Sequence, residues 1–300
     1  MYILAAIVTH NRCQLLSRCI DHIHSQSRPP DALVVINNGS TDNTLVMLAE
    51  RQVEVITQAN LGSAGGWHRA ISHCQEHGFD AVWLMDDDGY PAIDALQLLE
   101  QKLLPSVACA SSVVLQEDRP ERFVFPFPVL DSKGLPSIFA RPRKLHTLSS
   151  LEPISRQGCY PFAHLFNGAL VASTAIRQIG NVNPDFFIFG DEVDYFFRMR
   201  QVGEVISVLA ARHLHPDVSA RPYSTVKIYY YIRNTIILNK RYFSNVWLRH
   251  VMAIAAALWR TWRRNGAREA ISYLTGKRFP VIVQAIYAGL IGRLGHDFHG

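Results

Sequence analysis

The sequence predicts an α/β domain with a mostly parallel central sheet, followed by a helical C-terminal segment. Four short apolar runs, at residues 3–8, 32–36, 53–57 and 81–85, each end in a polar turn. Segments with apolar residues at helical spacing, such as 14–25 and 65–77, lie between them. Strands that alternate with helices form parallel sheets covered on both faces.

Composition narrows the class of protein. The 300 residues are 48% hydrophobic and 18% charged, which excludes a disordered chain. The five cysteines are scattered, without a CxxC pair, so we expect no zinc site or disulfide framework and a cytoplasmic protein. The first residues have the pattern of a strand and a turn, not of a signal peptide. A net charge of +5 favours an anionic partner.

The rest of the chain is less regular. Residues 105–160 are rich in Pro, Arg and Ser, and we expect loops and short, partly antiparallel strands there, near an acceptor site. Further elements are expected in the order strand, short helix, helix and strand, at 162–172, 176–180, 191–201 and 205–209. Beyond Tyr223 the pattern is helical. We therefore expect two parts, 1–240 and 241–300.

Polar clusters follow four of the predicted strands. They are His10-Asn11-Arg12, Asn37-Asn38, Asn60 with Gly62, and Asp86-Asp87-Asp88. Ligands of parallel sheets bind beyond the carboxyl ends of the strands. The sequence thus predicts that four distant loops meet at one ligand-binding edge.

The aspartate triplet is the main candidate for a metal site. Adjacent carboxylates repel one another unless a cation neutralises them, and Mg²⁺ or Mn²⁺ takes oxygen ligands together with phosphates. If the strand continued, Asp86 and Asp88 would project to one side and Asp87 to the other. An acidic turn that caps the next helix is the alternative, but the position at the sheet edge favours metal.

A glycine-rich stretch, Asn60-Leu61-Gly62-Ser63-Ala64-Gly65-Gly66-Trp67, opens a predicted helix. Its amides can face an anion, and its small residues permit close approach. The stretch is neither a GxGxxG dinucleotide motif nor a P-loop. Trp67 and Tyr90 can stack on a sugar or base, although core packing is the commoner use of a lone aromatic.

Three carboxylates, Asp191, Glu192 and Asp194, begin another predicted helix. Acids at a helix start can simply complement its dipole, and Asp194 fits that role. Transfer of a group to a hydroxyl needs a general base, and the apolar run 186–189 can raise a carboxylate pKa into the useful range.

Two histidines, His213 and His215, alternate along a predicted strand end, where one of them can complete a metal shell beside Asp88. A surface histidine without a ligand is the alternative. Arg233, after three tyrosines, is either a phosphate-binding cation or a structural one.

Together these motifs resemble glycosyltransferase family 2 over residues 2–240. Residues 7–12, 37–42 and 60–66 are similar to that family's nucleotide-binding loops, and Asp86-Asp87-Asp88 to its DxD motif. Residues 191–194, followed by Arg198 and Gly203, are similar to the segment that carries its catalytic base. The glycine loop and the triplet most resemble the galactofuranosyl- and rhamnosyltransferase branches.

The resemblance implies a GT-A fold and an inverting, metal-dependent transfer to a glycan or lipid-linked glycan in cell-surface polysaccharide synthesis. The expected donor is a UDP- or dTDP-sugar, with galactofuranose or rhamnose favoured. Glu192 or Asp191 would be the base, and Asp86 and Asp88, with His215 or His213, would hold Mn²⁺ or Mg²⁺. The donor would be bound by the following residues: Thr9, His10, Arg12, Asn38, Asn60, Gly62, Gly65, Gly66, Trp67, Asp86 and Asp87.

Two positions depart from the family pattern. Asn37-Asn38 stands where the family usually has an aspartate that contacts the nucleobase of the donor. An amide side chain can still pair with uracil or thymine. Glu192 stands where the family has a shorter acid, which leaves Asp191 as its rival.

Two other functions remain open from the residues. A sugar-phosphate nucleotidyltransferase also uses metal-binding acids, but residues 4–14 lack the expected glycine-rich loop with Arg and Lys. A non-catalytic membrane or glycan adaptor would act through its basic C-terminal helices.

The C-terminal segment, residues 245–300, carries arginines among Trp247, Trp259 and Trp262. This pattern is typical of a helix that lies on an anionic leaflet, or of a helical lid packed on the main domain. We expect peripheral attachment at the inner face of the plasma membrane, and no nucleic-acid binding, since no recognisable module accompanies the charge.

Overall fold

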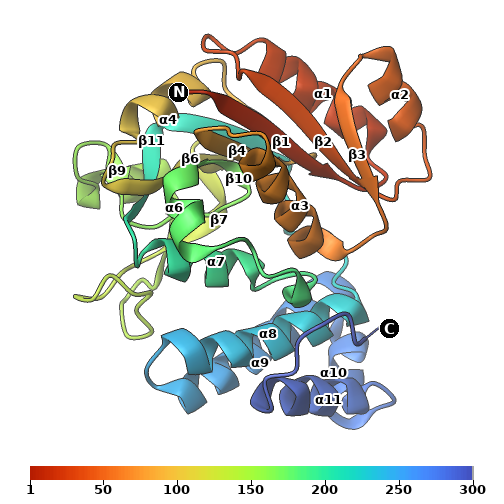
Figure 1. Ribbon diagram of the computed structural model, residues 1–300. Helices are drawn as coiled ribbons and strands as arrows, with labels where there is room; N and C mark the ends of the chain where they lie inside the picture. Colours follow the sequence, from red (N-terminus) through yellow and green to blue (C-terminus); the bar gives the residue numbers. More distant parts are fainter. Residues whose placement is uncertain (299–300) are drawn as a thin grey trace. The chain divides into compact units, whose positions relative to one another are not determined.

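A central sheet with the strand order β3-β2-β1-β4-β10-β6-β11-β5 organises the first of two units in the computed structural model, which describes residues 1–298 (Figure 1). This unit comprises residues 1–60, 66–181 and 198–217. Its strands are β1 (Ile3–Thr9), β2 (Ala32–Asn38), β3 (Glu54–Gln58), β4 (Ala81–Asp86), β5 (Tyr90–Pro91), β6 (Val107–Gln116), β7 (Arg122–Pro128), β8 (Lys144–Thr147), β9 (Cys159–Tyr160), β10 (Asn167–Ala172) and β11 (Glu204–His215).

Helices cover both faces of this sheet. They are α1 (Cys13–His24), α2 (Thr44–Glu50), α3 (Gly62–Glu76), α4 (Ala95–Lys102), α5 (Leu148–Leu151), the 3₁₀ turn η1 (Glu152–Ile154) and α6 (Ser173–Ile179). Leu16 of α1 and Leu96 of α4 pack in one core with Ile7 of β1. The next residue, Val8, points to the other face, where it lies against Gly66 of α3.

The predicted parallel sheet is confirmed. β1 pairs in parallel with β2 and β4, β2 with β3, and β6 with β11, whereas β10 and β5 are antiparallel to their neighbours. The carboxyl ends of β1, β2, β3, β4, β6 and β11 therefore share one edge. The four polar loops follow strands of this set, as the sequence predicted.

The prediction for residues 105–160 was wrong at its start. β6 is a ten-residue strand, buried throughout, and it lies between β10 and β11. The first part of β6 consists mostly of small residues, Val107-Ala108-Cys109-Ala110-Ser111-Ser112, and so lacks the run of bulky apolar side chains that marks a core strand. The neighbouring strands and helices fill the space around these small side chains. β7 and β8 are short and antiparallel, as expected.

Two strand ends also differ from the prediction. β10 begins at Asn167, since Phe162 lies in the preceding loop. β11 continues to His215, beyond the expected end at 209, and its register shifts between Val208 and Arg212. The apolar run ends at Leu209, so the prediction did not join it to the strand end that carries His213 and His215.

The second unit comprises residues 61–65, 182–197 and 218–300, of which the structure describes those up to 298. It contains η2 (Pro184–Phe186), most of α7 (Asp191–Met199), α8 (Thr225–Tyr242), α9 (Val246–Asn265), α10 (Ala267–Thr275) and α11 (Phe279–Leu290), the last four drawn in blue in Figure 1. Its core is aromatic, built around Tyr229, Tyr230 and Tyr273. Helix α8 runs through residue 240, and the division into 1–240 and 241–300 stays a prediction.

Arg233 has a structural role in this unit. Its side chain is fully buried, donates to the carbonyl oxygens of Asp185 and Phe186, and pairs with Asp297 at 2.6 Å. No helix among residues 1–298 is long and apolar enough to cross a bilayer.

Candidate active site

Hydrogen bonds join the loops at the carboxyl edge of the sheet. Thr9, the last residue of β1, donates to Asp87 Oδ2 at 2.7 Å. The ring of His10 lies 2.8 Å from the carbonyl oxygen of Asn38, the last residue of β2. Three of the predicted loops thus meet directly.

Arg12 supplies the cation that the aspartate triplet requires. Its Nη1 lies 3.0 Å from Asp87 Oδ1 and 2.5 Å from Asp88 Oδ2. Burial raises the pKa of Asp87 above its usual value, while Arg12 and the hydroxyl of Thr9 act in the opposite direction. Asp87 is therefore engaged by the protein's own donors and holds the β1 and β4 loops together.

The expected alternation of the three aspartates does not occur. β4 ends at Asp86, and the chain turns, so Asp87 and Asp88 both reach the same nitrogen of Arg12. Both are buried, whereas Asp86 is partly exposed.

His215 lies beside Asp88, with its Nε2 2.9 Å from Asp88 Oδ1. Its Nδ1 is 2.7 Å from the carbonyl oxygen of Pro216. If Nδ1 carries the proton and donates to that oxygen, the Nε2 lone pair points toward the carboxylate. A histidine whose Nδ1 donates to a backbone carbonyl in this way has Nε2 free to ligate a metal, whereas with the proton on Nε2 the contact is a direct hydrogen bond to Asp88.

His213 occupies a different environment. It is fully buried, and within residues 1–298 neither ring nitrogen has a hydrogen-bond partner. Burial lowers its pKa to about 3, so the ring is neutral. A Cβ atom on Gly89 would lie only 2.3 Å from His213 Nε2, which explains the glycine directly after the triplet. Of the two histidines, His215 is the one that contacts Asp88.

The β2 loop and the start of α3 form the neighbouring part of the edge. Gln58 donates to Asn38 Oδ1 at 2.7 Å, which fixes the orientation of that amide. A Cβ atom on Gly66 would lie 2.4 Å from Val8 and 3.1 Å from Asn38. Trp67 is buried and stacks on Phe166, with ring centroids 4.5 Å apart, so its indole packs in the core instead of facing a ligand. Tyr90 stacks on His22 and lies under Arg18.

In the second unit, the glycine-rich loop contacts the segment before α7. Ala64 N donates to the carbonyl oxygen of Phe187. Gly62 has φ +72°, and a Cβ there would collide with that same oxygen at 2.1 Å, so only glycine fits. Phe187 and Phe189 themselves have positive φ, which is strained for aromatic residues. The chain before the predicted base is thus held in an unusual shape.

The three carboxylates of α7 have different environments. Asp194 is buried and accepts from Arg241 at 2.6 Å and from Tyr242 at 2.7 Å, which is a structural role. Burial, and then the charge of Glu192, raise the pKa of Asp191 to about 7, against hydrogen bonds from backbone amides and Ser63. Glu192 is partly exposed.

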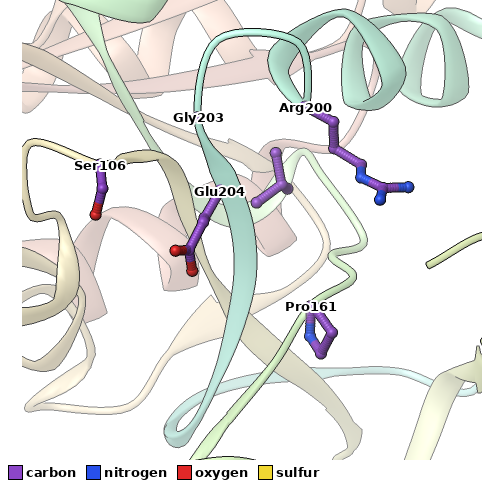
Figure 2. Close-up of a pocket in the computed structure, with 6 residues that line it drawn as sticks. Ser106, Pro161, Arg200, Gly203 and Glu204 are labelled. Atoms are coloured by element: carbon purple, nitrogen blue, oxygen red, sulfur yellow. The ribbon is translucent and has the colours of Figure 1, made fainter. Parts of the chain in front are cut away.

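Two other features lie apart from this edge. A hollow of about 400 Å³ opens where β11 begins, at the opposite end of that strand from His215, and is lined by Ser106, Pro161, Arg200, Gly203, Glu204 and Val205 (Figure 2). It therefore does not mark the donor site. Within residues 1–298, the group of three side chains spaced to hold a metal is His73, Glu76 and His77, with ligand atoms within 4.8 Å.

Sequence reasoning missed several partners of these residues. Arg18 donates to the carbonyl oxygen of Asp88 and pairs with Glu117 at 2.6 Å. Its position on α1, six residues after Arg12, was the available signal. Ser63 lay within the glycine-rich loop, but no sequence pattern linked it to Asp191. No sequence pattern linked Arg241 to Asp194 either.

Known proteins resemble this chain in sequence and in fold. Residues 5–141 match the model of glycosyl transferase family 2. Galactofuranosyltransferase GlfT1 of Mycolicibacterium smegmatis is 33% identical over 222 residues, which cover 71% of this chain and 70% of that protein. GlfT1 of Mycobacterium tuberculosis H37Rv is 35% identical over 224 residues, with the same coverage. The chain belongs to glycosyl transferase family 2. It is a glycosyltransferase with galactofuranosyltransferase relatives.

Solved structures show that the fold is GT-A. A structure of GalNAc-T7 with UDP, GalNAc and Mn²⁺ superposes with a TM-score of 0.56 at 14% identity, covering 79% of this chain but only 48% of that one. The mannosyltransferase PcManGT of Pyrobaculum calidifontis, in complex with GDP-Man and Mn²⁺, has the same TM-score and identity, with 97% and 88% covered. The family favours the glycosyltransferase over the nucleotidyltransferase and adaptor alternatives.

Proposed function

We propose that this enzyme is an inverting, metal-dependent transferase that moves a sugar, galactofuranose by preference over rhamnose, from a UDP- or dTDP-sugar. The acceptor is a glycan or lipid-linked glycan in cell-surface polysaccharide synthesis, reached at the inner face of the plasma membrane. The observation that carries the proposal is the pairing of Asp88 with His215 at the carboxyl edge of the sheet, joined to the 33% identity with GlfT1.

The residues present fit Mn²⁺ or Mg²⁺. Asp88 and His215 offer an oxygen and a nitrogen 2.9 Å apart, whereas Asp86, partly exposed, does not form a three-residue group with them. Divalent ions in such sites take few protein ligands and complete their shell with phosphate oxygens. A bound ion would neutralise the departing nucleoside diphosphate.

The protein's own groups hold the donor. Arg12, at the same edge, carries a charge that suits phosphate. Thr9 and Asp87 fix the loop that carries Arg12, and His10 and Asn38 lie where β1 and β2 end. The amide of Asn38 pairs with uracil or thymine, and the glycine-rich residues Asn60 to Gly66 leave room for the nucleotide.

Glu192 accepts the proton of the acceptor hydroxyl as that oxygen attacks the anomeric carbon. The bond to the diphosphate breaks on the opposite side, which inverts configuration. A general base must touch the hydroxyl, and Glu192 is partly exposed whereas Asp191 is buried. Asp191 positions the helix start through its hydrogen bond with Ser63.

A donor screen tests this function. Purified protein with Mn²⁺ is offered a panel of sugar nucleotides and a galactan acceptor, and nucleoside diphosphate release and product linkage are measured. We expect UDP-galactofuranose to be used, and both Asp88→Asn and Glu192→Gln to lower turnover by at least about a hundredfold.

The double variant His73→Ala/His77→Ala is the matched control, because it removes the other metal-suited group without touching the sheet edge. It should keep full activity. Metal-independent turnover, or full activity of Asp88→Asn, would contradict the proposal. If Asp191→Asn, and not Glu192→Gln, abolishes turnover, the base is Asp191.

A further inference from the structure

Exposed apolar side chains are concentrated on the C-terminal helices. Among residues 1–298, twelve large apolar side chains between Trp247 and Ile291 are exposed, against ten in the 246 residues before them. Monomeric proteins rarely leave such a density uncovered, and it marks an interaction surface.

These side chains form stripes at helical spacing. The stripe residues are Trp247, Val251, Trp259 and Trp262 on α9, Ile271 and Leu274 on α10, and Phe279, Val283, Tyr287 and Leu290 on α11. The opposite faces of α9 and α11 are buried through Ala253, Ala257 and Ala285. The stripes therefore face outward while the helices pack in the unit through their other side.

Charge identifies the partner. Eight arginines and lysines against two acids give residues 245–300 a formal charge of +6, more than the +5 of the whole chain. Arg263, Arg268, Lys277 and Arg293 are exposed and lie next to or between the stripe residues in the sequence. Three tryptophans, apolar stripes and an excess of cations suit the headgroup region of an anionic bilayer, where indole rings and arginines both find partners.

We propose that the stripes on α9, α10 and α11 form a membrane-binding surface for anionic lipid. The three helices lie in the plane of the leaflet with their stripes toward the lipid. Its use in the cell rests on the proposed function, because it would bring the enzyme to a lipid-linked acceptor. Each cation near an anionic membrane surface strengthens binding about fivefold. This electrostatic contribution is separate from that of the inserted apolar side chains.

Vesicle flotation with the 300-residue chain tests the surface without any sugar transfer. Vesicles of phosphatidylcholine alone are compared with vesicles that also contain phosphatidylglycerol. We expect binding to the anionic vesicles, weakened by salt, and at least about tenfold weaker binding to the neutral ones.

Two variants separate the contributions. Trp259→Ser/Trp262→Ser should lower binding to anionic vesicles at least about tenfold, and Arg263→Gln/Arg268→Gln about twentyfold, with a smaller salt effect. Phe139→Ser is the matched control, because Phe139 is 72% exposed but lies in the first unit, and it should bind like the parent protein.

Circular dichroism confirms that the variants are folded. Equal vesicle binding by all variants, or none by the parent protein, overturns the proposal. Concentration-dependent self-association that the tryptophan variant abolishes, with no vesicle binding, would assign the stripes to a second copy of the chain instead. Transfer to a water-soluble acceptor distinguishes failure of this surface from failure of the enzyme, since the tryptophan variant should retain it.

Discussion

Replacing Asp191 with asparagine should stabilise the protein relative to the parent chain. This gain in stability should be larger at neutral pH than at pH 5. The pKa of Asp191 is raised to about 7 in the folded protein by burial and by Glu192. In the unfolded chain an aspartate has a pKa near 4. The folded state therefore binds this proton more tightly, and its stability falls as pH rises from about 4 to about 7.

The size of the effect follows from the shift. Each pKa unit corresponds to about 1.4 kcal/mol, so the carboxylate costs up to about 4 kcal/mol once it is ionised. Between pH 5 and pH 7 the parent chain should lose about 2 kcal/mol through this group, and the asparagine variant should not.

Urea unfolding of both proteins at several pH values measures the difference, because other titrating groups cancel between them. Glu192→Gln is the internal control: removing its charge should shrink the pH-dependent difference without abolishing it, since burial is the larger cause. The measured quantity is the difference in free energy of unfolding between Asp191→Asn and the parent. If this difference stays constant within about 0.5 kcal/mol from pH 5 to pH 8, the reasoning is refuted.

Three further variants test other parts of the structure. His215→Ala should raise the half-saturating Mn²⁺ concentration for sugar transfer at least about tenfold, and an unchanged metal titration would exclude this histidine as a ligand. Gly89→Ala places a methyl group 2.3 Å from His213 Nε2 and should cost about 1–3 kcal/mol in urea unfolding, part of which Gly89→Ala/His213→Ala should restore. Arg233→Met removes the donor of the carbonyl oxygens of Asp185 and Phe186 and should cost about 1–3 kcal/mol, whereas the exposed Arg293→Met should change stability by less than about 0.5 kcal/mol.

Local sequence patterns predicted the first half of the fold well. β1, β2, β3 and β4 appear within a residue or two of their expected positions, because each is a short apolar run that ends in a polar turn. β6 was missed, since its alanines and serines become a core strand only through neighbours on both sides. The end of β11 was missed for a related reason, the irregular register against β6.

The residues of the edge could be predicted, but their individual roles could not. Thr9, His10, Arg12, Asn38 and the aspartates follow strands whose order and direction place them together. That Arg12 bridges Asp87 and Asp88, and that Trp67 packs on Phe166, depends on side-chain directions after the strands end. Those directions are set by contacts with distant segments.

The sequence by itself determined the family, the parallel sheet and the set of chemical groups at its carboxyl edge, because strand periodicity and motif order are local properties. Only the tertiary structure distinguished His215 from His213, and the partly exposed Glu192 from the buried Asp191. Neighbouring residues of one type differ in burial and partners, and those depend on what the rest of the chain packs against them. The same packing left the apolar stripes of α9 to α11 facing outward.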